Sequence, residues 1–278
     1  MAHPQIAAFA RLANGGQTPA RRIYGQTSML SRTMHDIRYN PVNDEILVPN
    51  PFSNAILTFR GGADGQEAPV RIIQGPNTEL NGPDRLDIDV VNREIFVPGR
   101  GNVLVFPLDG NGDVKPKRVV RGPDTQIDGS SIAVDPVNNL FAVTGRDRSI
   151  LVFDRTANGN VKPLRVIKGP NTQIDRINQM AIYPAGKLLV VAMPGVQGDM
   201  EPPRVFVGMW SLDDDGDVTP KWTITGKQTG LKKPFAVALN PEHKEIYVTD
   251  MRLNGVMTFF VPEVFQPVTQ SSAPANRR

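Results

Sequence analysis

The sequence predicts an all-β fold, a single β-propeller of five four-stranded blades, from three observations. A short apolar run ending in an aromatic residue recurs at Ile6–Phe9, Ile56–Phe59, Val103–Phe106, Ile150–Phe153 and, less regularly, before Trp210. Each aromatic is followed six residues later by Gly and ten residues later by Pro. After each such segment come an apolar run, a polar turn and a second apolar run. Repeats of about 45 residues with four short strands each are typical of propeller blades.

The four strands of a repeat are named a to d and are clearest in the third repeat. Strand a is Ile132–Val134, b is Leu140–Val143, c is Ile150–Phe153 and d is Arg165–Ile167. These runs are short and rich in Val and Ile, which favours strands. The Gly between c and d fits a hairpin position with positive φ. The recurring Pro and Arg of strand d suit an outer sheet edge, where they discourage further pairing.

The two ends of the chain decide how the ring closes. A c–d hairpin (6–25) precedes the first a–b hairpin, and the chain ends with a, b and a c-like run, Val256–Phe260. The simplest closure is five blades within residues 1–266, the last one completed by the N-terminal d strand. One c-like strand is then surplus, and it lies at an edge or pairs with a neighbouring molecule. Six blades, the alternative, need an inner hairpin that the sequence lacks. Residues 267–278 are small, polar and Pro-bearing, which predicts a disordered C-terminal tail.

Composition excludes several classes of function. The absence of Cys rules out disulfides, thiol catalysis and Cys-ligated metals. The net charge of +3 comes from interspersed residues, so it does not by itself indicate a nucleic-acid partner. No stretch is long and apolar enough for a membrane span. The N-terminus lacks the apolar region of a signal peptide, which predicts a cytoplasmic protein as the chain stands and an extracytoplasmic one if a signal peptide has been removed.

The strand motifs resemble a known group of propellers. SIAVD for strand a, IYV for strand b and ILVFD for strand c are similar to the NHL-type repeat and its gluconolactonase-like and TolB-like relatives, over roughly residues 6–262. The resemblance implies the propeller architecture. It selects no function, because such propellers include lactonases, lyases, RNA-binding modules and protein scaffolds.

Strand a of each blade is expected to line the central channel. Its alternation assigns to the core Ile37 and Tyr39, Leu86 and Ile88, Ile132 and Val134, Met180 and Ile182, Val237 and Leu239. The other face, the b–c loops and His35 predict a ligand site at the channel mouth made of His35, Asp36, Arg38, Arg85, Asp87, Arg100, Arg146, Gln179, Asp250 and Arg252. Guanidinium groups around one mouth bind phosphate or carboxylate. The alternative is that these Arg pair with the neighbouring Asp in a solvated ring.

A metal site is a second interpretation of the same face. Asp36, Asn50, Asp87 and Asp250 are hard oxygen ligands that suit Ca²⁺ or Mg²⁺. Gluconolactonase-like enzymes are similar in drawing such ligands from several blades, but no Glu begins any strand a here, which argues against lactone hydrolysis. The c–d loops DGNGDV and DDDGDV resemble the opening of a Ca²⁺ loop, and a repeated turn explains them equally. No Ser of a nucleophile motif accompanies His35, which argues against nucleophilic catalysis.

Three hypotheses for function follow. The first is a non-enzymatic binding or scaffold module that recognises a protein or a small anionic ligand at the channel face, with self-association through the terminal strands as a second mode. The second is a metal-dependent hydrolase or lactonase. The third is RNA or polyanion binding, which predicts affinity that falls steeply with salt.

Overall fold

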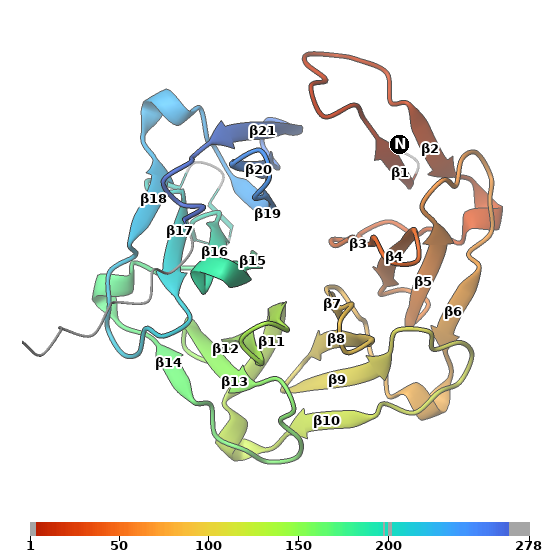
Figure 1. Cartoon of the computed structure of the whole chain (residues 1–278), viewed down its shortest axis with the longest axis horizontal. Helices are drawn as coiled ribbons and strands as arrows, with labels where there is room; N and C mark the ends of the chain where they lie inside the picture. Colours follow the sequence, from red (N-terminus) through yellow and green to blue (C-terminus); the bar gives the residue numbers. More distant parts are fainter. Residues whose placement is uncertain (1–3, 197, 200–201, 267–278) are drawn as a thin grey trace, which may run out of the picture.

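The predicted architecture is confirmed: a computed structural model shows an all-β ring of five blades built from antiparallel sheets (Figure 1). It describes residues 4–196, 198–199 and 202–266, and the predicted tail at 267–278 lies outside them. No helix in these residues is long and apolar enough to cross a membrane.

Four blades are complete and one is not. The first blade contains β3 (Arg38–Asn40), β4 (Glu45–Asn50), β5 (Ala55–Arg60) and β6 (Arg71–Gln74). The second contains β7 (Asp87–Asp89), β8 (Glu94–Gly99), β9 (Asn102–Pro107) and β10 (Arg118–Arg121). The third contains β11 (Ile127–Asp135), β12 (Leu140–Gly145), β13 (Ser149–Asp154) and β14 (Arg165–Ile167), and the fourth contains β15 (Gln179–Tyr183), β16 (Leu188–Met193), β17 (Phe206–Ser211) and β18 (Trp222–Thr225). The last blade has β19 (Pro234–Asn240), β20 (Glu245–Asp250) and β21 (Gly255–Phe260), and the N-terminal hairpin has β1 (Gln5–Ala8) and β2 (Arg21–Tyr24).

A short 3₁₀ turn follows each d strand. These turns are η1 (Gln26–Ser28), η2 (Pro76–Thr78), η3 (Pro123–Thr125), η4 (Pro170–Thr172) and η6 (Lys227–Thr229), and η5 (Pro184–Gly186) lies between β15 and β16. In each d–a turn the hydroxyl at the third turn position donates to the carbonyl of the Gly before the turn, as Thr78 does to Gly75 at 2.7 Å. The turn is therefore a repeated local structure, fixed by Gly-x-x-Thr or Gly-x-x-Ser.

The core lies between blades and is formed by the faces of neighbouring sheets. The aromatic that ends strand c is fully buried in each complete blade, as Phe59, Phe106, Phe153 and Trp210. Five apolar clusters fill the spaces between successive sheets, from the N-terminal hairpin to the last blade. Burial of these apolar faces is the main stabilising contribution to such a fold.

Backbone hydrogen bonds join the d strands β2, β6, β10 and β14 to the c–d loop of the blade that follows, and this junction is called a seam below. Ile73 of β6 forms a parallel bridge to Gly112, with Gly112 N–H donating to the Ile72 carbonyl at 2.6 Å. The same bridge joins Ile23 to Gly65, Val120 to Gly159 and Ile167 to Gly216. Gly112 has φ +75°, which confirms the positive φ predicted for this position.

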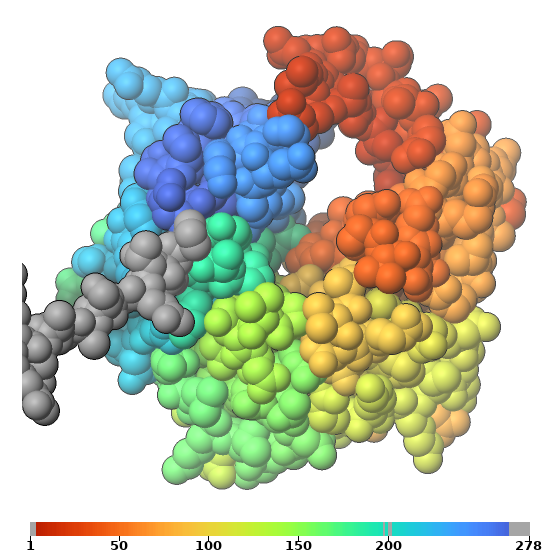
Figure 2. Space-filling model, viewed as in Figure 1, coloured from red at the N-terminus to blue at the C-terminus, as the bar shows by residue number. Residues whose placement is uncertain are grey.

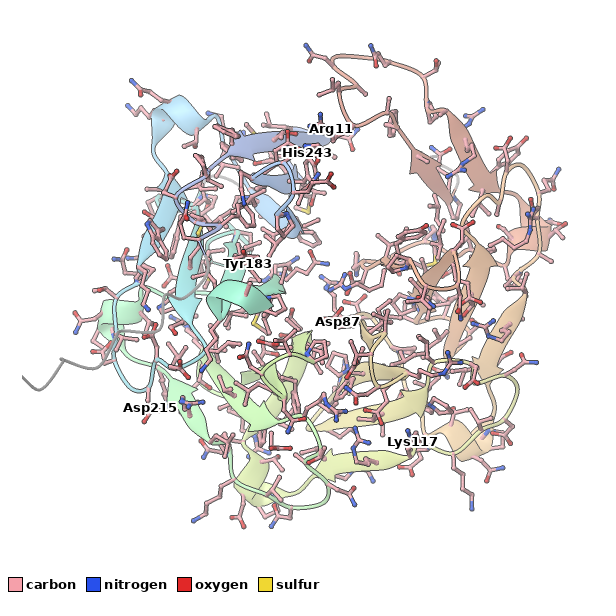
Figure 3. The ribbon with its side chains drawn as sticks, in the orientation of Figure 1. Arg11, Asp87, Lys117, Tyr183, Asp215 and His243 are labelled. Atoms are coloured by element: carbon pink, nitrogen blue, oxygen red, sulfur yellow. The ribbon has the colours of Figure 1, made fainter. Side chains whose placement is uncertain are left out.

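The ends of the chain differ from the predicted closure. We expected β2 to complete the last blade, but β2 pairs with β1 in a separate two-stranded sheet, and β19–β21 form a three-stranded one. The reason is that β1, itself a c-type strand, occupies the edge of β2 that the last blade would use. A side-chain ion pair, Arg11 to Glu245 at 2.7 Å, connects the hairpin to the last blade (Figure 3).

The same opening explains two incorrect assignments in strand a. Leu86, Ile132, Val134, Met180 and Val237 are buried as predicted, and Ile88, Ile182 and Leu239 are partly buried. Ile37 and Tyr39, predicted to be core residues, are 47% and 56% exposed. Both belong to the first blade, which faces the opening in the ring rather than a complete neighbouring blade (Figure 2).

Candidate functional site

Polar side chains from the inner strands connect neighbouring blades across the channel. Asp36 accepts the Leu86 N–H of the second blade at 3.2 Å, and Asp87, labelled near the ring centre in Figure 3, accepts the Val134 N–H of the third at 2.8 Å. Gln179 accepts the N–H of Val237, in the last blade, at 2.8 Å. These bonds give inner strands of different blades a fixed register around the channel.

The polar groups of this network bind one another. Arg38 donates its Nε to Asp87 at 2.7 Å and pairs with Asp36 through Nη1, and the Gln179 amide donates to Asp36 at 2.6 Å. Burial raises the pKa of Asp36, against the lowering effect of Arg38 and Arg85. Burial alone would lower the pKa of Arg38, but the Asp36 and Asp87 carboxylates raise it overall. The network holds blades together, and its groups already have partners.

A cavity of about 670 Å³ opens at the channel mouth beside this network. Its wall comes from the segments before β3, β7 and β15, from parts of β11, β12 and β19, and from the b–c loop of the third blade. It is lined by His35, Asp84, Arg85, Asp128, Ser130, Thr144, Gly145, Arg146, Asp147, Arg148, Asp175, Arg176, Ile177, Asn178 and Phe235. We call this cavity the mouth pocket.

Arg85 is the buried cation of the mouth pocket. Its side chain is only 5% exposed, and its Nε has no hydrogen-bond partner among the described residues. Nη1 donates to the Asp84 carboxylate at 2.9 Å, and the guanidinium lies 5.9 Å from the centre of the Phe235 ring. Burial lowers the pKa of Arg85, whereas the charges of Asp84 and Asp36 raise it in part. An additional anion beside Arg85 would offset the free-energy cost of removing its charge from water.

The rim adds three further guanidiniums, those of Arg146, Arg148 and Arg176. Arg176 makes a long 3.5 Å hydrogen bond to Asn178, and its charge contributes to lowering the pKa of Arg85.

Two acidic residues of the rim, Asp147 and Asp175, form ion pairs with cations that do not line the mouth pocket. Asp175 accepts Arg204 at 2.7 Å and lies 3.8 Å from Arg148, and Asp147 accepts Lys168 at 3.0 Å. Opposite Arg85, the His35 ring contacts Asp84 at 2.5 Å and Phe235 edge-on at 5.9 Å. Four Arg and four Asp therefore line the mouth pocket, and two of these Asp also pair with cations from outside it.

The structure divides the predicted ligand set among several places. His35, Arg85 and Arg146 line the mouth pocket, and Asp36, Arg38, Asp87 and Gln179 form the channel network. Arg100 lies at a hollow of about 60 Å³ with Glu79 and Leu80, and Arg252 lies at one of about 450 Å³ beside η6. Asp250 accepts the N–H groups of Lys232 and Lys233 at 2.7 and 2.8 Å. Arg176, Asn178 and Phe235 line the mouth pocket and were not predicted from the sequence. The available signal was the DRIN segment before β15 and the KKPF segment that leads into β19.

The four predicted metal ligands are not brought together. Asp36 and Asp87 bind Arg38, whereas Asn50 accepts the Ser31 hydroxyl at 2.7 Å and donates to the Met29 carbonyl at 2.8 Å. Among the described residues no group of three or more His, Cys, Asp or Glu is arranged to hold a metal ion. The Asp residues of the c–d loops bind the neighbouring blade instead: Asp113 accepts the Asn77 N–H at 2.7 Å, and Asp217 accepts that of Asn171 at 2.7 Å.

Comparison with known proteins identifies the fold and no family. No family model matches this chain, and no curated protein does. Among solved structures 1122 chains match, so the fold is too widespread to indicate one function. One is a chain of the "Crystal Structure of Mitotic Checkpoint Complex", with a TM-score of 0.59 and 14% identity over 88% of this chain and 67% of that chain. The likeness shows the propeller fold, and the NHL-type or gluconolactonase-like resemblance stays an expectation.

Proposed function

We propose that this protein is a non-enzymatic binding module that holds an anionic group, a carboxylate or a phosphate, in the mouth pocket. The observation that carries the proposal is Arg85, a guanidinium that is 5% exposed, lines the cavity and has an unpartnered Nε. Its one carboxylate partner, Asp84, is 45% exposed and is shared with His35. A buried cation with so little compensation favours a ligand of opposite charge.

The surroundings of Arg85 support recognition rather than catalysis. Arg146, Arg148 and Arg176 place planar donors around the rim, and such donors bind carboxylate and phosphate oxygens in pairs. The Phe235 ring covers one side, which lowers the local dielectric and strengthens charge-assisted hydrogen bonds. The channel network behind the mouth pocket holds the inner strands in register, so the donors are positioned before a ligand arrives.

The anionic group is either a free small molecule or part of a protein partner. The solved chain of similar fold belongs to a multiprotein complex, and propellers commonly act as scaffolds, which supports the protein-bound form. The chemistry at Arg85 is the same in both cases, so free anions are suitable first probes.

Titration calorimetry of the whole chain with citrate and with inorganic phosphate tests the proposal. We expect Arg85→Met, which keeps the length and apolar stem of the side chain, to weaken binding about tenfold to a hundredfold. Arg176→Gln should weaken it less. Arg60→Gln is the matched control, because Arg60 is 59% exposed, pairs with Glu67 and does not line the mouth pocket.

Circular dichroism establishes that each variant is folded. Two results contradict the proposal: folded Arg85→Met that binds both anions as tightly as the wild type, or wild type that binds neither. Affinity should also fall as salt is raised, by more for the wild type than for Arg85→Met.

A further inference from the structure

The ring has one opening, between the N-terminal hairpin and the last blade (Figure 2). A mostly apolar hollow of about 460 Å³ lies there, lined on one side by Gln5, Ile6 and Ala7 of β1 and on the other by Phe235, Ala236, Val237, Ala238, Tyr247 and Thr249. Ile37 also faces this hollow and is half exposed. Apolar groups on both sides of the opening thus lack the covering that every other blade has.

The mouth ends of the first and last blades nevertheless already touch. The His35 ring, before β3, packs edge-on against Phe235 of β19 at 5.9 Å. The channel network also links these blades, because Gln179 bonds both Asp36 and Val237. These contacts leave little room for the inner a–b hairpin of a sixth blade. The part that the ring lacks is the outer d strand of the last blade.

β1 and β21 are strands of the same type, and the register shows that they compete for one partner. In the first blade, strand c pairs Ile56 with Ile73 and Thr58 with Arg71. β1 pairs with β2 in the same register, Ile6 with Ile23 and Ala8 with Arg21. The repeat aligns Val256 and Thr258 of β21 with Ile56 and Thr58, so β21 carries the same pattern for β2. Strands of one type run in the same direction, so β1 and β21 cannot extend the antiparallel sheet by pairing with each other.

The free edge of β21 has the hydrogen-bonding groups that a d strand needs. Val261 N–H donates to Lys244 at 2.9 Å, on the β20 side, so by alternation the Val256, Thr258 and Phe260 backbone faces outward. In the first blade the Thr58 carbonyl accepts from Val70, just before β6, at 2.7 Å. The matching bond in the last blade joins the Thr258 carbonyl to the Ala20 N–H, which now donates to Ala8 at 2.8 Å.

An ion pair between strands b and d points to the same closure. Glu45 at the start of β4 accepts Arg71 at the start of β6 at 2.6 Å, and Glu94 accepts Arg118 at 2.7 Å. Glu245 occupies this position in the last blade, and Arg21 occupies the Arg position on β2. In the structure Glu245 binds Arg11 of the exposed hairpin loop instead.

The seam after β18 gives an independent match. In the other seams an Asn or Asp of the c–d loop accepts a d-strand N–H, as Asn111 does from Ile72 at 3.0 Å, and the following Gly bridges the next residue of that strand. Within the described residues no such bridge follows β18. The N-terminal loop contains Asn14 and Gly15 at the matching positions, upstream of β2 by the same spacing as Asn111 and Gly112 from β10. Their partners in a closed ring are Thr223 and Ile224.

We propose that β2 exchanges its partner from β1 to β21, which completes the last blade and closes the ring within one molecule. β1 is the strand that leaves, because its ladder has four residues and none of them is buried. The β20–β21 ladder has six residue pairs, and Val264 and Phe265 just after β21 are buried in the core beneath it. The covalent connection and the Arg11 contact keep β2 near β21, which favours this exchange over pairing with a second copy.

Disulfide trapping in the whole chain tests the exchange, because the protein has no Cys of its own. In the closed ring Met257 lies opposite Arg22, as Leu57 lies opposite Ile72 in the first blade. We expect Arg22→Cys with Met257→Cys to oxidise to an intramolecular disulfide, identified by peptide mass mapping. Arg22→Cys with Ala7→Cys is the matched control, because Ala7 and Arg22 are paired in the open ring. Removal of residues 1–8 should raise the yield of the first disulfide several-fold.

A charge exchange provides a second readout that does not depend on oxidation. Arg21→Glu should lower the thermal midpoint, and Arg21→Glu with Glu245→Arg should restore it, because the pair forms only in the closed ring. Three results overturn the proposal: a disulfide in the control but none between positions 22 and 257, disulfides only between two molecules, or a double charge variant less stable than both single ones.

Discussion

The second blade and the last blade begin from similar sequences and differ in how their shared groups are used. Strand b starts with Glu94 in one and Glu245 in the other, and Phe106 and Phe259 occupy the same repeat position near the end of strand c. Phe106 is fully buried, whereas Phe259 is only partly so. The Glu94 side chain is 4% exposed and binds Lys117, Arg118 and Arg155. Glu245 pairs with Arg11, whose side chain is 38% exposed.

The difference shows that a blade depends on its outermost strand. The second blade has β10 on its outer edge, and the third blade covers its face. The last blade lacks a d strand in its sheet, so its Glu position has no Arg from the same blade and its aromatic lies near the surface. The predictions below compare the same repeat positions in these two blades, from the largest expected effect to the smallest.

The largest contrast concerns the aromatic that ends strand c. We expect Phe106→Ala to lower the free energy of unfolding by about 4 kcal/mol, because removal of the ring leaves a cavity in a closed core. Phe259→Ala should cost less than half as much, because part of that ring is already in water. Denaturant titration with both variants measures the difference. Equal losses would show that the last blade is as completely packed as the second.

The next contrast concerns the Glu that begins strand b. Partial burial alone would raise the pKa of Glu94, but hydrogen bonds from Arg118 and Lys117 outweigh it and lower the pKa to about 2. Glu94→Gln leaves these cations without a carboxylate and should cost roughly 3 kcal/mol at neutral pH. Glu245→Gln should cost much less, because its side chain is near the surface and its cation comes from an exposed loop.

The pH dependence of that loss has a defined sign. A carboxylate whose folded-state pKa is lowered stabilises the protein above its ordinary value of 4.5, and this stabilisation is lost as pH falls towards about 2. The stability difference between wild type and Glu94→Gln should therefore be constant above pH 5 and shrink below 4.5. A difference that grows on acidification would contradict the assignment of this ion-pair cluster.

The repeat made most of the fold predictable. Five copies of one spacing fixed strand type and blade number, because side-chain alternation and the positive-φ Gly are local properties of the chain. The repeat spacing does not predict which strand pairs with β2 to close the ring. The sequence contains two c-type strands for one position, and the choice between β1 and β21 depends on the total contacts that each strand makes. Ile37 and Tyr39 show the same effect. They share the face of strand a that the alternation assigns to the core, but no complete blade covers that face, so both side chains are exposed.

Strand alternation predicts which residues of strand a face the channel, and it does not predict the other residues that line the mouth pocket. The alternation of strand a placed Asp36, Arg38 and Asp87 on the channel face, and the structure joins them in one network. The mouth pocket draws on the segments between d–a turns and strand a, where the repeat has no fixed residue type. Arg176 lies in such a segment and Phe235 lies at the start of β19, so periodicity gave no reason to choose them.

The smallest effect compares an occupied seam with the open one. Asp113 accepts the N–H of Asn77 at 2.7 Å and its side-chain amide at 2.7 Å, so Asp113→Ala should lower the free energy of unfolding by about 1 kcal/mol.

The N-terminal loop has Gly16 at this position, so the turn at Gly226 has no equivalent acceptor. Gly16→Asp supplies one, and a Cβ fits there because no atom lies within 4 Å. We expect Gly16→Asp to raise the thermal midpoint of unfolding slightly. The seam after β18 forms only when β2 has joined the last blade, and the Arg21–Glu245 pair stabilises that arrangement. The stabilisation should therefore disappear when Arg21 or Glu245 is replaced. Stabilisation that persists in Arg21→Glu would show that the new carboxylate acts elsewhere.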